Sequence, residues 1–479
     1  MVQADHDLTL EETSTASEPI IKSELLYGLN DKPPAGEALF VALQHVLASF
    51  VGIITPPLII AGALGLDPVN TSYIVSMSLF ASGLCTFIQC RRIGPVGSGL
   101  LSLQGTSFAF LGPIIGVGTG AVQGGSSPEQ ALALIFGLCF FGSSVEIILS
   151  RFLHLLGKII TPVVSGTVVM IIGLGLIRTG MISLAGGAAA QRAADGTFGS
   201  WQNLGLGGLV MAIVVILTVS GNRLLRMGAI AIGLIIGYIL AAFMGLVNFS
   251  ALSSLPVFSL PIPFRYGMRF DFPTFLPFIL LYVLTAIETV GDLTATSAVS
   301  GEPVKGPVYV RRIKGGVLGD GVNSAIAALL NTFPNTTFSQ NNGVIQMTGV
   351  GSRYVGFFVA SIFAILGLLP IVGGVFQAIP QPVLGGATLI MFGSIAVAGL
   401  NIVASSNLDR RSMIIVAVSL ALGLGVLYAP DIFQGKPPIF QNLFGSSIST
   451  GGLTAILLSW LLPGKNDAEE VSQDFVEEA

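Results

Sequence analysis

Charged side chains are scarce in this chain of 479 residues: only 10% are Asp, Glu, Lys or Arg, and the mean hydropathy is +0.84. A soluble domain of this size needs a far larger share of charge on its surface. The composition therefore argues against a soluble enzyme or binding domain and predicts a polytopic membrane protein. The formal net charge of −4 is uninformative about partners, and no nucleic-acid partner is expected.

Cysteine is also rare. Cys85, Cys90 and Cys139 are an odd number of thiols inside apolar stretches, which excludes a paired disulfide framework and a metal-ligand spacing. The chain lacks the GxxxxGK[ST], HExxH and GxSxG patterns. We therefore expect neither an enzyme nor a bound metal or cofactor, and a role in packing for the thiols.

Long polar runs are confined to the ends. Residues 1–36 have no apolar core of a cleavable signal peptide and form a predicted cytoplasmic tail, with residues 1–30 expected to be disordered. A short acidic tail, residues 465–479, ends the chain. Between the two tails we expect two repeats of seven spans each, residues 37–250 and 251–464.

About fourteen apolar stretches fill this region, which predicts an all-α fold with about fourteen transmembrane segments. They begin near residues 38, 71, 100, 129, 157, 202, 228, 273, 313, 337, 355, 381, 411 and 447. The third and tenth, around Leu100 to Gly116 and Thr337 to Val350, are too polar and glycine-rich for simple helices. We predict that both are broken, part extended and part helical.

Basic residues predict the orientation. With a cytoplasmic N-terminus and fourteen crossings, sixteen of the 21 Lys and Arg residues fall on the cytoplasmic side, as membrane proteins prefer. The other five are Arg178, Arg192, Arg265, Arg269 and Lys436. Both termini are therefore expected in the cytoplasm.

A faint internal repeat relates the two halves. Pro162 to Gly173 in the fifth segment matches Pro382 to Gly393 in the twelfth at Pro, Val, a small residue and the closing Gly. A separation of seven crossings makes the halves enter the membrane in opposite directions, as in secondary transporters. The same shift pairs the two broken segments, which points to a solute site near the membrane midplane.

Ionisable residues inside spans cost about 2.5 to 3.5 kcal/mol each at mid-helix and mark functional positions. Glu288 and Asp292 lie four residues apart in the eighth segment and share a helix face, where their charges repel. This face is a candidate for binding protons, a solute or both. Asp320, in the ninth segment, either joins this site or bonds backbone freed at a broken segment. His45, in the first segment, is a packing histidine or a proton relay.

The broken segments supply the remaining candidates. Ser107 and Phe108 place a flat apolar face beside a hydroxyl, which suits a planar heterocycle, although Phe108 is equally consistent with ordinary packing. Ser339 and Gln340 open a run of amides, and an amide presents a donor and an acceptor side by side. Glu288 is suited to accept from ring N–H groups on the same edge. The pattern favours a planar, N–H-rich solute.

The run Gln340-Asn-Asn-Gly-Val-Ile-Gln-Met-Thr-Gly349 resembles the signature of nucleobase-ascorbate transporters, and the resemblance extends from Ala38 to about Pro463. Further matches are Gln44-His45, Gly97 to Gln104, Glu288 to Asp292 with Thr294-Ala-Thr296, and Lys314 to Asp320. The bacterial xanthine permeases are most similar. This resemblance implies a fourteen-span core-and-gate fold, a homodimer in the inner membrane, and proton symport by an elevator-like movement.

The same resemblance implies roles for individual residues. Glu288 and Gln340 would bind the purine and Phe108 would stack on it. Asp320 and Asn341 match positions needed for activity, and Asp292 is a carboxylate of the purine branch. His45 and Ser107 match positions that tune affinity and specificity.

The sequence departs from the patterns of related branches at two points, and two other classes of function remain open. The uracil branch has a glutamate in place of Gln340 and a histidine in place of Asp292, so this chain favours a purine such as xanthine, uric acid or guanine. Some xanthine transporters have asparagine where this chain has Ser107. A channel or uncoupled facilitator for a small polar solute, and an anion transporter of similar architecture, are the other classes.

Overall fold

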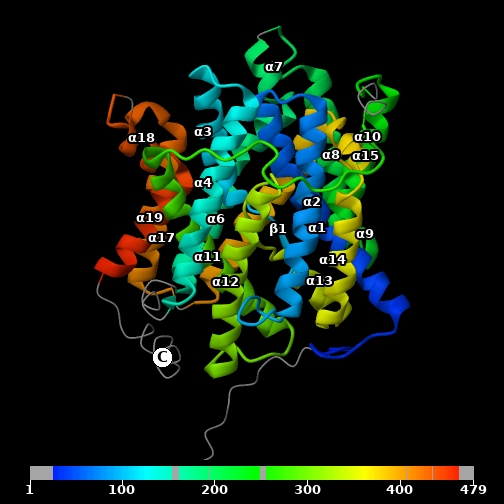
Figure 1. Cartoon of the computed structure of the whole chain (residues 1–479), viewed down its shortest axis with the longest axis vertical. Helices are drawn as coiled ribbons and strands as arrows, with labels where there is room; N and C mark the ends of the chain where they lie inside the picture. Colours follow the sequence, from blue (N-terminus) through cyan, green and yellow to red (C-terminus); the bar gives the residue numbers. More distant parts are fainter. Residues whose placement is uncertain are drawn as a thin grey trace, which may run out of the picture.

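The computed structural model describes residues 25–153, 161–193, 195–248, 255–406, 408–433 and 435–462 as a mostly helical bundle (Figure 1). The acidic tail predicted at residues 465–479 lies outside these described residues. The helices are α1 (Ala35–Leu64), α2 (Pro68–Arg91), η1 (Phe108–Phe110), α3 (Leu111–Gln123), α4 (Pro128–Leu149), α6 (Pro162–Leu184), α7 (Gly187–Ala193), α8 (Trp201–Thr218), α9 (Arg223–Met227), α10 (Ala229–Phe243), α11 (Phe272–Val299), α12 (Gly306–Leu329), α13 (Gln340–Thr348), α14 (Arg353–Gly367), α15 (Pro370–Gln377), α16 (Gln381–Ala404), α17 (Arg410–Tyr428), η3 (Pro430–Phe433), α18 (Pro438–Phe444) and α19 (Ser447–Leu461). The strands are β1 (Gln104–Thr106) and β2 (Asn335–Thr337).

Local sequence sets where several of these helices begin. Asp67 accepts hydrogen bonds from the backbone N–H groups of Val69 and Asn70 at the start of α2. Ser127 and Gln130 form a reciprocal capping box at the start of α4. These contacts satisfy amide groups that have no partner in the first helical turn, so the helices begin where such residues precede an apolar run.

Eight helices of the described chain are long and apolar enough to cross a membrane, or nine if the bent pair α14 and α15, whose axes differ by 78°, counts as one span. The chain is therefore a multi-pass membrane protein. A helix lies at or near each of the fourteen predicted stretches. Several are too short for this criterion, so fourteen crossings in two inverted sets of seven stay a prediction.

The two stretches predicted to be interrupted meet as a small antiparallel sheet. β1 pairs with β2 in the register Gln104 with Thr337, Gly105 with Thr336 and Thr106 with Asn335. Each strand is followed by a short helix, η1 and α3 after β1 and α13 after β2. The pairing satisfies backbone groups that a broken segment would otherwise leave without partners in the middle of the protein.

The ring of Phe338, directly after β2, is wedged between α1 and β1. A Cβ atom on Gly52 of α1 would lie 2.8 Å from the ring, and one on Gly105 of β1 would overlap it. Glycine at both positions therefore lets an aromatic side chain enter between the strand and the first helix.

Helices α6 and α16 pack closely and antiparallel. Gly166 of α6 faces Gly399 of α16, and Gly173 faces Ala396. Small residues at such contacts let two membrane helices approach until their backbones touch. These are the helices that carry the repeated motif, and they run in opposite directions.

Residues 25–31 form a segment, here called the N-terminal strap, that lies against the loop after α13. The N–H groups of Leu26 and Tyr27 donate to the carbonyl of Gly349, and the N–H of Gly351 donates to the carbonyl of Tyr27. The prediction of disorder through residue 30 is therefore wrong for residues 25–30. Main-chain pairing with a distant loop, which has no signature in local composition, orders them.

Candidate functional site

The candidate site is built where β1, β2 and helices α11 to α13 meet. Helix α11 contacts α12, α13 and β2, and β2 also contacts α12. These elements lie in the middle of the bundle in Figure 1. They bring residues of the third, eighth, ninth and tenth predicted stretches together.

Asp320 is the hub of a buried hydrogen-bond network. Its carboxylate is fully buried and accepts from Gln89 Nε2 at 2.7 Å and Gln104 Nε2 at 2.8 Å. Thr289 of α11 donates to its second oxygen. The side chain thus joins α2, β1, α11 and α12 through side-chain donors.

Asp292 ties α11 to the second strand. Thr337 Oγ1 donates to its Oδ2 at 3.1 Å, and Asp292 is only 5% exposed. One turn later, Thr296 Oγ1 donates to Asn342 Oδ1 of α13 at 2.8 Å. This face of α11 therefore holds both β2 and the helix after it.

Glu288, the other carboxylate predicted on this face, has a buried oxygen without a partner. Its Oε2 atom accepts no hydrogen bond from the protein, and Asp292 and Asp320 are acidic neighbours that act on it electrostatically. Unpaired buried acceptors are rare and costly in proteins. Such an atom is suited to an N–H donor of a ligand or to a proton.

Gln340 and Ser339 begin α13, and both are half-buried. α13 contacts α11, so the amide-rich helix lies against the helix that carries Glu288. The structure thus brings the two elements of the predicted solute site together.

Ser107 and Phe108 follow β1. The backbone N–H of Ser107 donates to the carbonyl of Pro334 at 2.8 Å, while its buried hydroxyl oxygen has no hydrogen-bond partner. The ring of Phe108 is 6% exposed and meets Phe392 of α16 edge to face, with centroids 5.5 Å apart. One face of α16 therefore supports the ring predicted to stack on a solute.

His45 and Asn341 lie beside each other between α1 and α13. His45 is fully buried, and neither ring nitrogen has a hydrogen bond of good geometry. Asn341 donates to the backbone carbonyl of Leu101, while its own side-chain oxygen lacks a partner. The two residues connect α1, the loop before β1 and the start of α13.

A fourth acidic side chain of this cluster, the buried Glu146 of α4, was missed in the sequence. It is 1% exposed, accepts from Thr285 Oγ1 of α11 at 2.6 Å, and has a second oxygen without a partner. Asp320 and Glu288 are its acidic neighbours. It lies five residues before Arg151 and so reads as an ordinary charge near a helix end. The rule applied to Glu288, an ionisable residue inside an apolar helix, would have found it.

None of these four carboxylates has an ion pair with Lys or Arg in the described part of the chain. No group of three or more His, Cys, Asp or Glu residues is arranged to hold a metal ion among the described residues. Several anionic groups buried without cations are expensive, and each is stable only when neutralised by a proton or bonded by donors.

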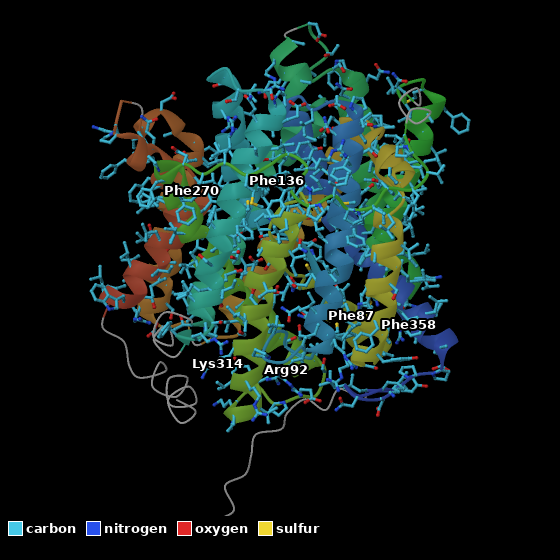
Figure 2. All side chains as sticks on the ribbon, viewed as in Figure 1. Phe87, Arg92, Phe136, Phe270, Lys314 and Phe358 are labelled. Atoms are coloured by element: carbon cyan, nitrogen blue, oxygen red, sulfur yellow. The ribbon has the colours of Figure 1, made fainter. Side chains whose placement is uncertain are left out.

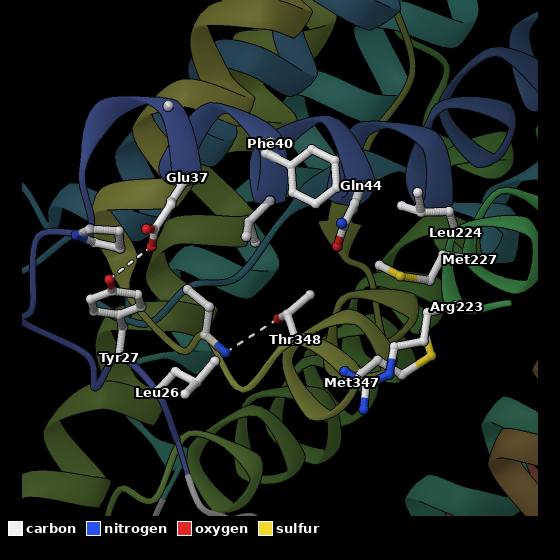
Figure 3. A pocket seen from close by; sticks show the side chains of 14 residues that line it. Leu26, Tyr27, Glu37, Phe40, Gln44, Arg223, Leu224, Met227, Met347 and Thr348 are labelled. Carbon is white, nitrogen blue, oxygen red and sulfur yellow. Dashed lines mark hydrogen bonds between the residues drawn. The ribbon is translucent and has the colours of Figure 1, made fainter.

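A hollow of about 520 Å³ opens at the far end of α13 from Gln340. Figure 3 shows Gln44 of α1 facing it, with Met347 and Thr348 from the end of α13 and Tyr27 from the N-terminal strap. Tyr27 donates to Glu37 at 2.8 Å across its rim. Gln44, which lines the hollow, directly precedes His45 on α1.

Known proteins resemble this chain over most of its length. A model of a permease family matches residues 36–432. The chain is 50% identical over 442 residues to xanthine permease XanP of Escherichia coli K12, covering 92% of this chain and 95% of that protein. It is 47% identical over 449 residues to xanthine permease XanQ of the same strain, covering 94% and 96%.

Solved structures share the fold at low identity. The transmembrane domain of the cyanobacterial bicarbonate transporter BicA has a TM-score of 0.54 and 14% identity, covering 90% of this chain and 99% of that one. The murine anion transporter Slc26a9 in its inward-facing state has a TM-score of 0.61 and 11% identity, covering 90% and 69%. These similarities show a transporter fold and nothing about the solute.

Proposed function

The chain belongs to the nucleobase-ascorbate transporter family, and on this premise we propose that it takes up a purine nucleobase, xanthine above all, together with a proton. It is a transporter and not an enzyme, since its relatives are named permeases. The observation that carries the proposal is the unpaired, buried oxygen of Glu288 on the helix that contacts α13.

Purine recognition is proposed at the junction of the two broken segments. Glu288 accepts from ring N–H groups, the amide of Gln340 reads the same edge of the ring system, and Phe108 stacks on its face. Ser107 and Ser339 flank the solute, and the hollow beside Gln44 is its path to the cytoplasm. A pocket built on such hydrogen bonds rejects analogues that lack the matching groups. Xanthine is expected to bind best, with uric acid and guanine as further candidates.

Proton coupling is proposed at the carboxylate cluster of Glu146, Glu288, Asp292 and Asp320. A proton taken up from outside neutralises a buried charge, which allows the loaded site to move through the protein. His45 and Asn341 tune the site from α1 and α13. At a membrane potential of about 100 mV one proton supplies about 2.3 kcal/mol, equivalent to an accumulation ratio of about fifty-fold.

The architecture proposed around this site is two inverted repeats of seven spans, divided into a core and a gate, in a homodimer of the bacterial inner membrane. Both termini are placed in the cytoplasm. The antiparallel contact of α6 with α16, the helices with the repeated motif, supports the inverted arrangement. In an elevator movement the core would carry the site past the gate.

Radiolabelled xanthine uptake by cells lacking their own purine permeases tests the proposal. Wild type is expected to accumulate xanthine against its gradient, and a protonophore should abolish this. Glu288→Gln should lose accumulation, whereas Glu129→Gln, at a half-buried position in the first turn of α4, should retain it. Competition by uric acid, guanine and uracil then ranks the substrates. Accumulation that survives the protonophore would favour another coupling ion, and equilibration without accumulation would favour a facilitator.

A further inference from the structure

A second hollow, of about 220 Å³, is lined by four arginines. Arg92, Arg311, Arg312 and Arg353 face it. Leu29, Asn30, Ser98, Gly99 and Val308 complete its wall. Figure 2 shows Arg92 and Lys314 at the lower end of the bundle, the end predicted to face the cytoplasm. The candidate purine site and this hollow share no lining residue.

The fold brings these arginines together from three separate elements. Arg92 follows α2 in a left-handed conformation, with φ of 53°, and so turns the chain sharply. Gly99, also at positive φ, lies where a Cβ atom would be 3.7 Å from Arg92 Cβ and 3.8 Å from Arg353 Nη1. Arg353 is the first residue of α14, and Arg311 and Arg312 lie near the start of α12. The preference for basic residues on the cytoplasmic side explains why this end of the protein has many arginines. It does not explain why four of them line one hollow.

Positive charge is concentrated around this hollow. Glu302 pairs with Arg312 at 2.7 Å, whereas no acidic side chain of the described residues forms an ion pair with Arg92 or Arg353. Partial burial, with repulsion from the guanidinium groups of Arg311 and Arg312, lowers the pKa of Arg92. Like charges held this close are costly unless an anion lies between them.

We propose that this hollow binds a phosphate group. The planar guanidinium fork matches phosphate oxygens with two parallel hydrogen bonds, and several arginines around one cavity suit a group with multiple negative charges. The first turn of α12 has no side-chain cap, and Val308 in that turn lines the wall, so the helix dipole adds to the attraction. The phosphate belongs to a phospholipid headgroup or to a soluble phosphate compound.

Binding would join the ends of α2, α12 and α14. Helix α12 also carries Asp320, and Gln89 of α2 bonds to that carboxylate. An occupied phosphate site is therefore expected to stabilise the folded protein without taking part in purine recognition.

The test uses purified full-length protein in phosphatidylcholine nanodiscs. Its thermal midpoint is measured alone, with phosphatidylglycerol added to the bilayer, and with inorganic phosphate added to the buffer at constant ionic strength. The double variant Arg92→Gln, Arg353→Gln is compared with Arg91→Gln, Arg151→Gln. The control pair removes the same charge from exposed positions outside the hollow. Xanthine binding by each variant confirms that it is folded.

Wild type and the control pair are expected to gain stability with phosphatidylglycerol, with inorganic phosphate or with both. The hollow variant should need about tenfold or more of the same anion for the same gain. A gain with lipid alone identifies a headgroup, and a gain with inorganic phosphate identifies a soluble ligand. Arg311→Gln, at the exposed rim, should act in the same direction and replaces the double variant if that protein is poorly folded. No gain in wild type, or equal loss in the control pair, overturns the proposal.

Discussion

At the scale of single residues, the candidate site contains two kinds of carboxylate oxygen. Some accept several hydrogen bonds, and others are buried without a partner. Asp320 receives donors from four elements, α2, β1, β2 and α11, whereas Glu288 and Glu146 each keep one oxygen without a hydrogen bond. The carboxylate of Asp320 joins neighbouring elements, whereas the unpaired oxygens of Glu288 and Glu146 can still accept a hydrogen bond or a proton.

Replacing Asp320 by alanine is expected to destabilise the protein by about 2 to 4 kcal/mol, because Gln89, Gln104 and Thr289 would lose a shared acceptor. Asp320→Asn keeps an oxygen acceptor and should lose less. Asp292→Ala, which removes the acceptor of one side-chain donor, is the matched comparison. The thermal unfolding midpoints of the three variants are measured in detergent. Equal midpoints for Asp320→Ala and wild type would show that the hydrogen bonds to Asp320 do not stabilise the protein.

Glu146→Gln is expected to fold, because the amide oxygen still accepts from Thr285 and no cation is left without its partner. Uphill xanthine accumulation should fall by up to about fifty-fold at about 100 mV if this carboxylate takes part in coupling, with exchange of xanthine across the membrane retained. Uptake and counterflow assays in the same vesicles measure uphill accumulation and exchange separately. Normal xanthine accumulation in the variant would show that Glu146 takes no part in proton coupling.

At the scale of elements, the site depends on two strands of three residues each and on the aromatic ring beside them. Polar and glycine-rich composition was enough to predict that these stretches are irregular, because neither reads as a continuous apolar helix. Their pairing in one sheet, and the insertion of Phe338 between Gly52 and Gly105, depend on contacts between residues more than 200 positions apart. Local pattern contains no information on such contacts.

Gly105→Ala is expected to cost about 1 to 3 kcal/mol and to impair xanthine uptake, because the new methyl group overlaps the ring of Phe338 and the ring has no room on its Gly52 side. Gly112→Ala, in α3 of the same stretch, adds its methyl group in open space and should be tolerated. Adding Phe338→Leu to Gly105→Ala should restore part of the loss in stability. Unfolding midpoints and uptake rates are measured for each variant. A Gly105→Ala protein with unchanged stability and uptake would show that the ring of Phe338 is not tightly packed against position 105.

At the scale of the whole molecule, composition was sufficient to identify a multi-pass membrane protein, since an apolar chain with so few charges has no soluble alternative. The motif around Gln340 was sufficient to identify the family. Glu146 was missed although it is an ionisable residue inside an apolar helix, whereas the arginine hollow was not found because it is defined by the neighbours that folding brings together. The same applies to the N-terminal strap, whose order comes from the loop after α13.

The predicted orientation leads to a labelling experiment. Gln191→Cys, on the side predicted to face outward, should react with a membrane-impermeant maleimide on intact cells. Lys305→Cys should react only after the membrane is opened. Both positions are exposed, and the native thiols at Cys85, Cys90 and Cys139 are buried, so background labelling is expected to be low. The reverse labelling pattern would show that the predicted orientation is wrong and that the protein lies the other way round in the membrane.

The strap also has a practical consequence for reporting on the transport cycle. Because Tyr27 is paired through its main chain with the loop that ends α13, a displacement of α13 is expected to move the N-terminal strap as well. A fluorophore attached near Asn30 would sense this displacement from outside the proposed purine pocket. The strap thereby reports on movements at the centre of the protein.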